Sequence, residues 1–221
     1  MAKISDKLLP WVWAYREQLR VLDEMDAFYL DCTEGANGRC WNKITLERFL
    51  FDYKLTRGHH AAVRQNVLKV YRALQGALDN HEGETPDELN ELWQEAVTAI
   101  GATILKTRSS NPPRLLSLAS KLIWFHRPNS MTMYDDLAVR GLKAWMRSNG
   151  HRLNQEKYIV EFEAFFRGKQ KHIGEASQYV DRIYPYPRRV ADKWLWLQGN
   201  KKRDEILANF RSSLKRAPIR A

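Results

Sequence analysis

Residues 85–106 read TPDELNELWQEAVTAIGATILK, and no other stretch of the chain carries a clearer local signal. Thr85 suits the N-cap of a helix, Pro86 suits its first turn, and Glu88 completes a capping box with the threonine. The stretch therefore predicts a long helix that begins at Pro86 and runs to about Lys106.

Helical patterns continue on both sides of this stretch. The expected helices before it cover residues 8–30, 44–55 and 60–78, and those after it cover 114–126, 135–148, 154–167, 177–184, 188–197 and 201–214. The sequence has no internal repeat, and no alternating run long enough to predict a strand. We therefore expect an all-α protein, a compact orthogonal bundle of about eight to ten helices.

One break stands out between these helices. Residues 107–113 include Ser109-Ser110-Asn111-Pro112-Pro113, a combination typical of a turn or linker. At 221 residues the chain is of a size that one domain can fill. We expect a single domain over residues 1–221 with a soft subdomain boundary at 107–113.

Charge changes sign at the same place. Residues 1–110 contain 14 Lys and Arg against 16 Asp and Glu, whereas residues 111–221 contain 22 against 10. The whole chain has a net charge of +10, so the second half carries all of the excess. A surface of this kind favours polyanions, nucleic acid first.

The basic half also interleaves its cations with aromatic residues. Arg and Lys neutralise phosphates, and exposed aromatic rings can stack on unpaired bases. We therefore expect a nucleic-acid-binding protein, for DNA rather than RNA, that contacts phosphates without catalysis of its own. The other reading makes Tyr184, Trp194 and Leu197 core residues with the cations as their solvated rim. The expected contact residues are Arg114, Arg188, Arg189, Lys193, Lys201, Lys202 and Arg203.

Residues 117–142, SLASKLIWFHRPNSMTMYDDLAVRGL, resemble the catalytic segment of the helix-hairpin-helix DNA glycosylases. That family uses a lysine nucleophile in its bifunctional members, and an aspartate at the start of the next helix that an arginine follows five residues later. The resemblance implies a DNA glycosylase or lyase with Lys121 as nucleophile and Asp135, paired in spacing with Arg140, as the acidic residue. Residues 117–120 stand where the family has its hairpin glycines.

The same residues also have a structural explanation. Helical spacing puts Ser117, Lys121 and Trp124 on one stripe, and Leu118, Leu122 and Phe125 on another that would face the core. Lys121 would then mark the solvent side of its helix. Asp135 or Asp136 would cap the next helix.

A second pair, Arg167 and His172, resembles the Arg–His motif of the HEPN ribonucleases, with Gly168 where that family usually has a polar residue. The alternative is a basic helix end that complements the helix dipole. A third class of function is a protein-interaction partner of a larger bacterial effector, for which the acidic residues 82–95 would offer a surface.

Several classes of protein are not supported by the sequence. It contains no phosphate-binding loop, dinucleotide fingerprint, zinc-protease motif or nucleophile elbow, so we expect no cofactor and no metal. No apolar run is long enough for a membrane helix, and the N-terminus lacks the pattern of a signal peptide, which predicts a cytoplasmic protein without a membrane partner. In that compartment Cys32 and Cys40 are expected to be free thiols.

Overall fold

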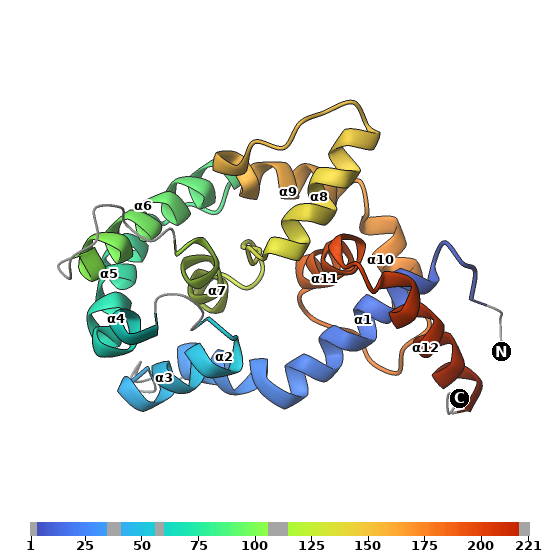
Figure 1. The fold of residues 1–221 in the computed structure, drawn as a ribbon, viewed down its shortest axis with the longest axis horizontal. Helices are drawn as coiled ribbons and strands as arrows, with labels where there is room; N and C mark the ends of the chain where they lie inside the picture. The colour runs from blue at the N-terminus through green and yellow to red at the C-terminus, as the bar shows by residue number, and fades with distance from the viewer. Residues whose placement is uncertain (1–3, 35–40, 56–59, 106–114, 217–221) are drawn as a thin grey trace. The chain divides into compact units, whose positions relative to one another are not determined.

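The computed structural model describes residues 4–34, 41–55, 60–105 and 115–216. Within these residues every regular element is helical, which confirms the all-α class (Figure 1). The α-helices are α1 (Leu9–Val21), α2 (Ala27–Glu34), α3 (Lys43–Asp52), α4 (His60–Gln65), α5 (Val67–Asp79), α6 (Pro86–Leu105), α7 (Leu116–His126), α8 (Asp136–Ser148), α9 (Tyr158–Arg167), α10 (Gln170–Ser177), α11 (Pro187–Gly199) and α12 (Arg203–Arg216).

The capping box at the start of α6 forms as the sequence predicts. The Glu88 carboxylate accepts hydrogen bonds from the Thr85 backbone N–H at 3.0 Å and from its hydroxyl at 2.6 Å. The Glu88 N–H lies 3.4 Å from the same hydroxyl oxygen. These bonds stabilise the ionised carboxylate and hold the pKa of Glu88 below its usual value.

Three helices differ from the expected boundaries. The helix expected over residues 8–30 contains a π-helical turn, Leu22–Asp26, between α1 and α2. The helix expected over residues 60–78 is interrupted at Asn66, whose side-chain amide donates to the Ala62 carbonyl at 2.9 Å and ends α4 there. The short helix expected over residues 177–184 is wrong, because the helical turns lie earlier, in α10. That helix buries Ile173 and Ala176, so packing outweighs the low helix propensity of Gly174.

The chain divides into two compact units. Unit 1 contains Met1–Val21, Asp135–Asn154 and Glu161–Ala221, and unit 2 contains Leu22–Tyr134 and Gln155–Val160. The soft boundary that we expected at 107–113 lies outside the described residues. Unit 1 contains 22 Lys and Arg against 11 Asp and Glu, and unit 2 contains 14 against 15. All of the positive excess therefore belongs to one structural unit.

Unit 1 is built on a close crossing of α8 and α11 (Figure 1). A Cβ atom at Gly141 of α8 would overlap the backbone carbonyl of Leu195 in α11, and one at Gly199 would overlap that of Leu137. Only glycine leaves room for the two backbones to approach this closely. The same crossing fixes where the chain leaves α11 and turns into α12.

The core of unit 2 surrounds α7. Eight consecutive residues of this helix, from Leu118 to Phe125, are buried. Phe125 packs against an aromatic cluster from α2, α3 and the residues before α3, and Trp93 of α6 donates its indole N–H to the Leu116 carbonyl at 3.0 Å. The predicted core stripe of α7 is confirmed, but the helix has no solvent-facing stripe in this region.

Two further expectations concern the environment of the chain. No helix among the described residues combines the length and apolar character needed to cross a bilayer. Cys32 is disulfide-bonded, which differs from the free thiol that we expected.

Candidate nucleic-acid interface

Lys121 lies in the interior of unit 2. The residue is only 8% exposed, which corrects the expectation that it marks the solvent side of α7. Its ammonium group donates a 2.5 Å hydrogen bond to the Ser117 hydroxyl, one turn earlier, and lies 3.5 Å from the Tyr134 carbonyl oxygen. Polar partners of this kind are what a buried amine requires.

The neighbouring Ser120 ties α7 to the segment that follows it. Its hydroxyl accepts a 2.8 Å hydrogen bond from the Tyr134 N–H. The Tyr134 ring lies against Trp93 and Tyr158, with ring centroids 5.3 Å and 5.0 Å apart respectively. Lys121 therefore has aromatic rings nearby at Tyr134, and the hydroxyl groups of Ser117 and Ser120 on its own helix.

Asp135 performs the capping role that the sequence allows. Its backbone is extended, and its carboxylate accepts a 2.9 Å hydrogen bond from the Leu137 N–H at the start of α8. Lys121 belongs to unit 2 and Asp135 to unit 1.

Arg188 forms strong contacts within unit 1. Its guanidinium binds one carboxylate oxygen of Glu163 at 3.0–3.1 Å and lies over the Phe166 ring, 4.6 Å from the centroid. The other oxygen of Glu163 accepts a bond from Arg167 at 3.1 Å. These contacts hold the start of α11 against α9. The guanidinium of Arg188 is therefore occupied by contacts within the protein.

Arg189 is a clearer departure from the expected interface. It is 7% exposed, and it forms a 2.5 Å ion pair with Asp192, which is 5% exposed. A buried charge of this kind depends on its partner. Arg189 therefore lies beneath the surface on which we expected it to contact phosphates.

Lys193 is also enclosed by its own chain. Its ammonium lies 4.4 Å from the Trp196 ring centroid and 5.4 Å from that of Trp13. Burial lowers its pKa, an effect that Glu17 opposes and Arg189 reinforces. The cation is thus satisfied largely by the faces of two indole rings.

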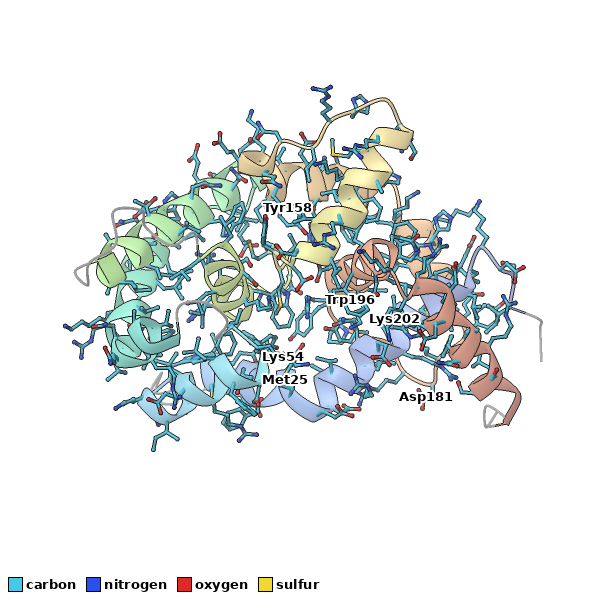
Figure 2. The ribbon with its side chains drawn as sticks, in the orientation of Figure 1. Met25, Lys54, Tyr158, Asp181, Trp196 and Lys202 are labelled. Atoms are coloured by element: carbon cyan, nitrogen blue, oxygen red, sulfur yellow. The ribbon has the colours of Figure 1, made fainter. Side chains whose placement is uncertain are left out.

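The remaining expected cations lie at the start of α12. Lys201, Lys202 and Arg203 are all exposed, and Lys202 makes a long, 3.9 Å contact with Glu205 (Figure 2). One residue, Asn200, separates them from Gly199, which packs against α8. Arg114 lies outside the described residues.

A basic stripe on α8 was not recognised from the sequence as an interface. Arg140, Lys143 and Arg147 follow one another at spacings of three and four residues, so they share one face of the helix. All three are exposed, and none forms an ion pair with a described residue. Gly199 packs against Leu137 and Gly141 of α8, and Lys201 follows Gly199 by only two residues. We call these three residues together with Lys201, Lys202 and Arg203 the basic surface.

The residues with an alternative core reading differ in their burial. Tyr184 and Leu197 are buried, at 2% and 0% exposure, and Trp194 stacks on Trp11 with centroids 4.7 Å apart. This arrangement confirms the core reading for Tyr184 and Leu197, whereas Trp194 is half-buried. The neighbouring rings of Tyr186 and Trp196 are half-buried as well.

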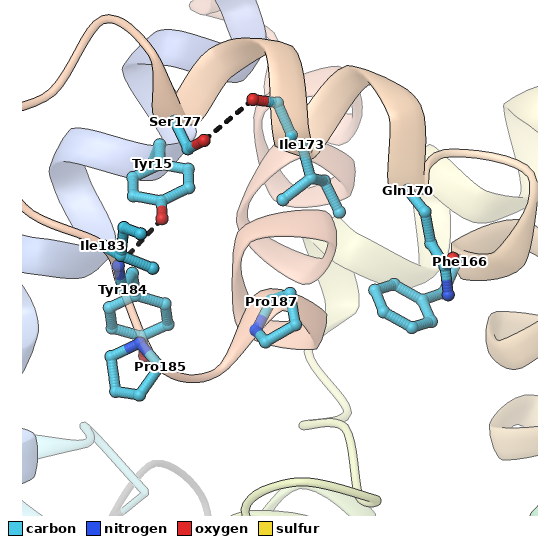
Figure 3. A pocket seen from close by; sticks show the side chains of 10 residues that line it. Tyr15, Phe166, Gln170, Ile173, Ser177, Ile183, Tyr184, Pro185 and Pro187 are labelled. Atoms are coloured by element: carbon cyan, nitrogen blue, oxygen red, sulfur yellow. Dashed lines mark hydrogen bonds between the residues drawn. The ribbon is translucent and has the colours of Figure 1, made fainter.

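An apolar groove of about 440 Å³ lies beside α10 (Figure 3). The Tyr184 N–H donates to the Tyr15 hydroxyl at 2.8 Å at one end, and the Ser177 hydroxyl donates to the Gly174 carbonyl at 2.8 Å. Ile183, which lines the groove, is 80% exposed. No charged side chain lines this groove, so it is unsuited to phosphate.

Arg167 and His172 lie on different helices and have different contacts. Arg167 is held by Glu163 on α9, whereas His172 lies on α10 and stacks on Trp11 with centroids 5.7 Å apart. Burial lowers the pKa of His172, and Lys169, Lys7 and Lys171 lower it further while Glu175 opposes them. No group of three or more His, Cys, Asp or Glu in the described part of the chain is arranged to hold a metal ion.

No protein-family model matches the chain, and no curated protein or solved structure matches it either.

Proposed function

We propose that the protein binds nucleic acid, with DNA preferred, through phosphate contacts made by the basic surface of unit 1. The observation that carries the proposal is the stripe of Arg140, Lys143 and Arg147, whose exposed charges have no acidic partner among the described residues. Cations left unpaired on a surface are available to neutralise phosphates and release counterions. The net charge of +11 on unit 1 against −1 on unit 2 makes the attraction one-sided.

The structure also changes which of the expected residues belong in the proposal. Arg188, Arg189 and Lys193 have protein partners, so they support the unit rather than the ligand. Phosphate contact then rests on α8 and on the first residues of α12. Such contacts position a nucleic acid but carry little sequence information, so binding is expected to be weakly selective.

Fluorescence anisotropy with single-stranded and duplex oligonucleotides, over a range of salt, tests the proposal. A protein that contacts phosphates loses affinity steeply as salt rises, with a slope of about 0.9 per contact on duplex DNA in a double logarithmic plot. Binding that is absent at low salt contradicts the proposal. Binding that is insensitive to salt contradicts the phosphate contacts.

A second candidate function is a DNA lyase or glycosylase that uses the Lys121 amine, and the burial of that residue favours it. A lysine that attacks an aldehyde must be neutral, and a buried site disfavours the ammonium form. The amine would add to the C1′ aldehyde of an open abasic sugar and lose water to form an imine. Asp135, which the resemblance makes the acidic residue, remains part of this second candidate.

Borohydride trapping distinguishes the two candidates, because hydride converts the imine into a stable secondary amine. The lyase candidate predicts a covalent adduct with abasic duplex DNA that is lost in Lys121→Ala and kept in Lys69→Ala, an exposed lysine on α5. Salt-dependent binding without any adduct supports binding alone.

A further inference from the structure

A small pocket lies between the residues just before α1 and helix α10, which both belong to unit 1. Its volume is about 170 Å³. Since a water molecule occupies roughly 30 Å³ in the liquid, the pocket has room for a tetrahedral oxyanion and a few waters. The lining residues are Ser5, Lys7, Leu8, Lys171, His172 and Glu175.

The electrostatic field in this pocket is positive. Lys7 and Lys171 line it, and Lys169 stands close enough to act on the same imidazole. Glu175 is the opposing charge, but its contact with Lys171 is 3.9 Å long and both side chains are exposed. Exposed pairs of this length hold their partners weakly, so an anion can compete for the lysine.

His172 is the most firmly placed group of the pocket. Its ring stacks on Trp11, which in turn stacks on Trp194, so the imidazole cannot turn freely. The Nδ1 atom is buried and has no hydrogen-bond partner among the described residues. An orphaned buried N–H is rarer than an orphaned acceptor, so the proton of the neutral ring belongs on Nε2. That nitrogen then serves as a donor for a ligand.

We propose that this pocket binds a phosphate group, held by the Lys7 and Lys171 ammonium groups and the His172 imidazole. A phosphate group offers anionic acceptor oxygens, which suits a pocket lined by two ammonium groups and an imidazole donor. The inference deepens the proposed function and rests on it in one respect, that the phosphate belongs to a nucleic acid. It is separate from the basic surface, since none of the six residues of that surface lines the pocket.

The phosphate could be an internal phosphodiester, with two non-bridging oxygens and one negative charge, or a terminal phosphomonoester, with three terminal oxygens and a larger charge. Oligonucleotides with and without a 5′-phosphate separate these sources. Equal affinity assigns the pocket to the backbone, and tighter binding of the phosphorylated strand assigns it to a chain end.

Inorganic phosphate tests the pocket without any nucleic acid. We expect phosphate to shift the imidazole NMR signals of His172 saturably and to raise the pH at which they titrate, because a bound anion stabilises the imidazolium. Sodium chloride at equal ionic strength is the control for screening. Lys7→Gln and Lys171→Gln should each weaken the phosphate response at least threefold, whereas Lys201→Gln on the basic surface should leave it unchanged.

The outcomes separate the two proposals. No saturable response of His172 to phosphate beyond that to chloride overturns the pocket, even if nucleic acid still binds through the basic surface. A phosphate response that survives in both lysine variants also overturns it. A phosphate response in a protein that binds no oligonucleotide overturns the proposed function and keeps the pocket.

Discussion

The ammonium group of Lys121 lies 2.5 Å from the hydroxyl oxygen of Ser117, one turn earlier on α7. The pair stands on a helix that is buried on all sides between Leu118 and Phe125. Burying a lysine costs stability unless polar partners compensate for the lost hydration of its amine. A substitution at Lys121 can therefore test separately whether its amine stabilises α7 and whether it reacts with DNA.

Replacing Lys121 by methionine keeps the length of the side chain and removes the amine. We expect the free energy of unfolding to change by less than about 1.5 kcal/mol, as for swaps that conserve volume in a core. If the amine acts on DNA, trapping should vanish while stability is retained. Urea denaturation measures the first quantity and borohydride trapping the second. A loss of several kcal/mol would instead show that the amine holds α7 in place.

The glycine contacts between α8 and α11 predict a sharp steric effect. Gly141→Ala and Gly199→Ala each place a Cβ atom onto a backbone carbonyl that cannot move independently. We expect each to destabilise unit 1 by about 1–3 kcal/mol, the usual cost of overpacking. Gly76→Ala is the matched control, because a Cβ there meets nothing within 4 Å and should stabilise α5 by up to about 1 kcal/mol. Equal effects at all three positions, measured by thermal unfolding, would contradict the close crossing.

The buried pair of Arg189 and Asp192 predicts a loss of stability rather than of affinity. Asp192→Ala leaves the arginine charge without its partner and should cost about 3–5 kcal/mol. The double substitution Arg189→Met with Asp192→Leu removes both charges and should recover most of that loss. Chemical denaturation of the three proteins checks this. A double variant that is as unstable as the single one would show that the pair contributes more than its mutual attraction.

His126 gives the protein a predictable response to acid. Burial lowers its pKa from 6.5 to about 4, and the adjacent Arg127 adds to the effect. The folded state therefore binds this proton less readily than the unfolded chain does. Stability is fully present above pH 6.5 and falls as the pH drops towards 4, by roughly 2–3 kcal/mol.

The variant His126→Gln isolates this contribution. Glutamine keeps a polar group near the Tyr71 hydroxyl, which lies 3.2 Å from the His126 Nε2 atom, but it does not titrate. The difference in unfolding free energy between wild type and variant should shrink or reverse between pH 7 and pH 4.5. A difference that is constant over this range would contradict the lowered pKa.

Local signals account for the parts of the fold that the sequence predicts well. Thr85 and Glu88 form a capping box because both partners lie within one turn, and Asp135 caps α8 for the same reason. The burial of Lys121 and Arg189 was not predicted because it depends on helices that are distant in sequence. Helical spacing alone identifies a face of α7 or α11 but does not tell which faces a neighbouring helix will cover.

The basic stripe of α8 illustrates the opposite case. Arg140, Lys143 and Arg147 could have been grouped from their spacing, since every third or fourth residue of a helix shares a face. In the glycosylase resemblance, Arg140 matters only for its distance from Asp135. What the sequence does not contain is the packing of Gly199 against α8, which brings the start of α12 to the same helix.

The most direct test of the account reverses the charge of this stripe. The triple variant Arg140→Glu, Lys143→Glu and Arg147→Glu is compared by fluorescence anisotropy with Arg64→Glu, Lys69→Glu and Arg72→Glu, three exposed cations of unit 2 that change the net charge equally. We predict at least a tenfold loss of oligonucleotide affinity, and a shallower dependence on salt, in the α8 variant alone. Equal losses in both variants, or none in the first, would contradict binding through the basic surface of unit 1.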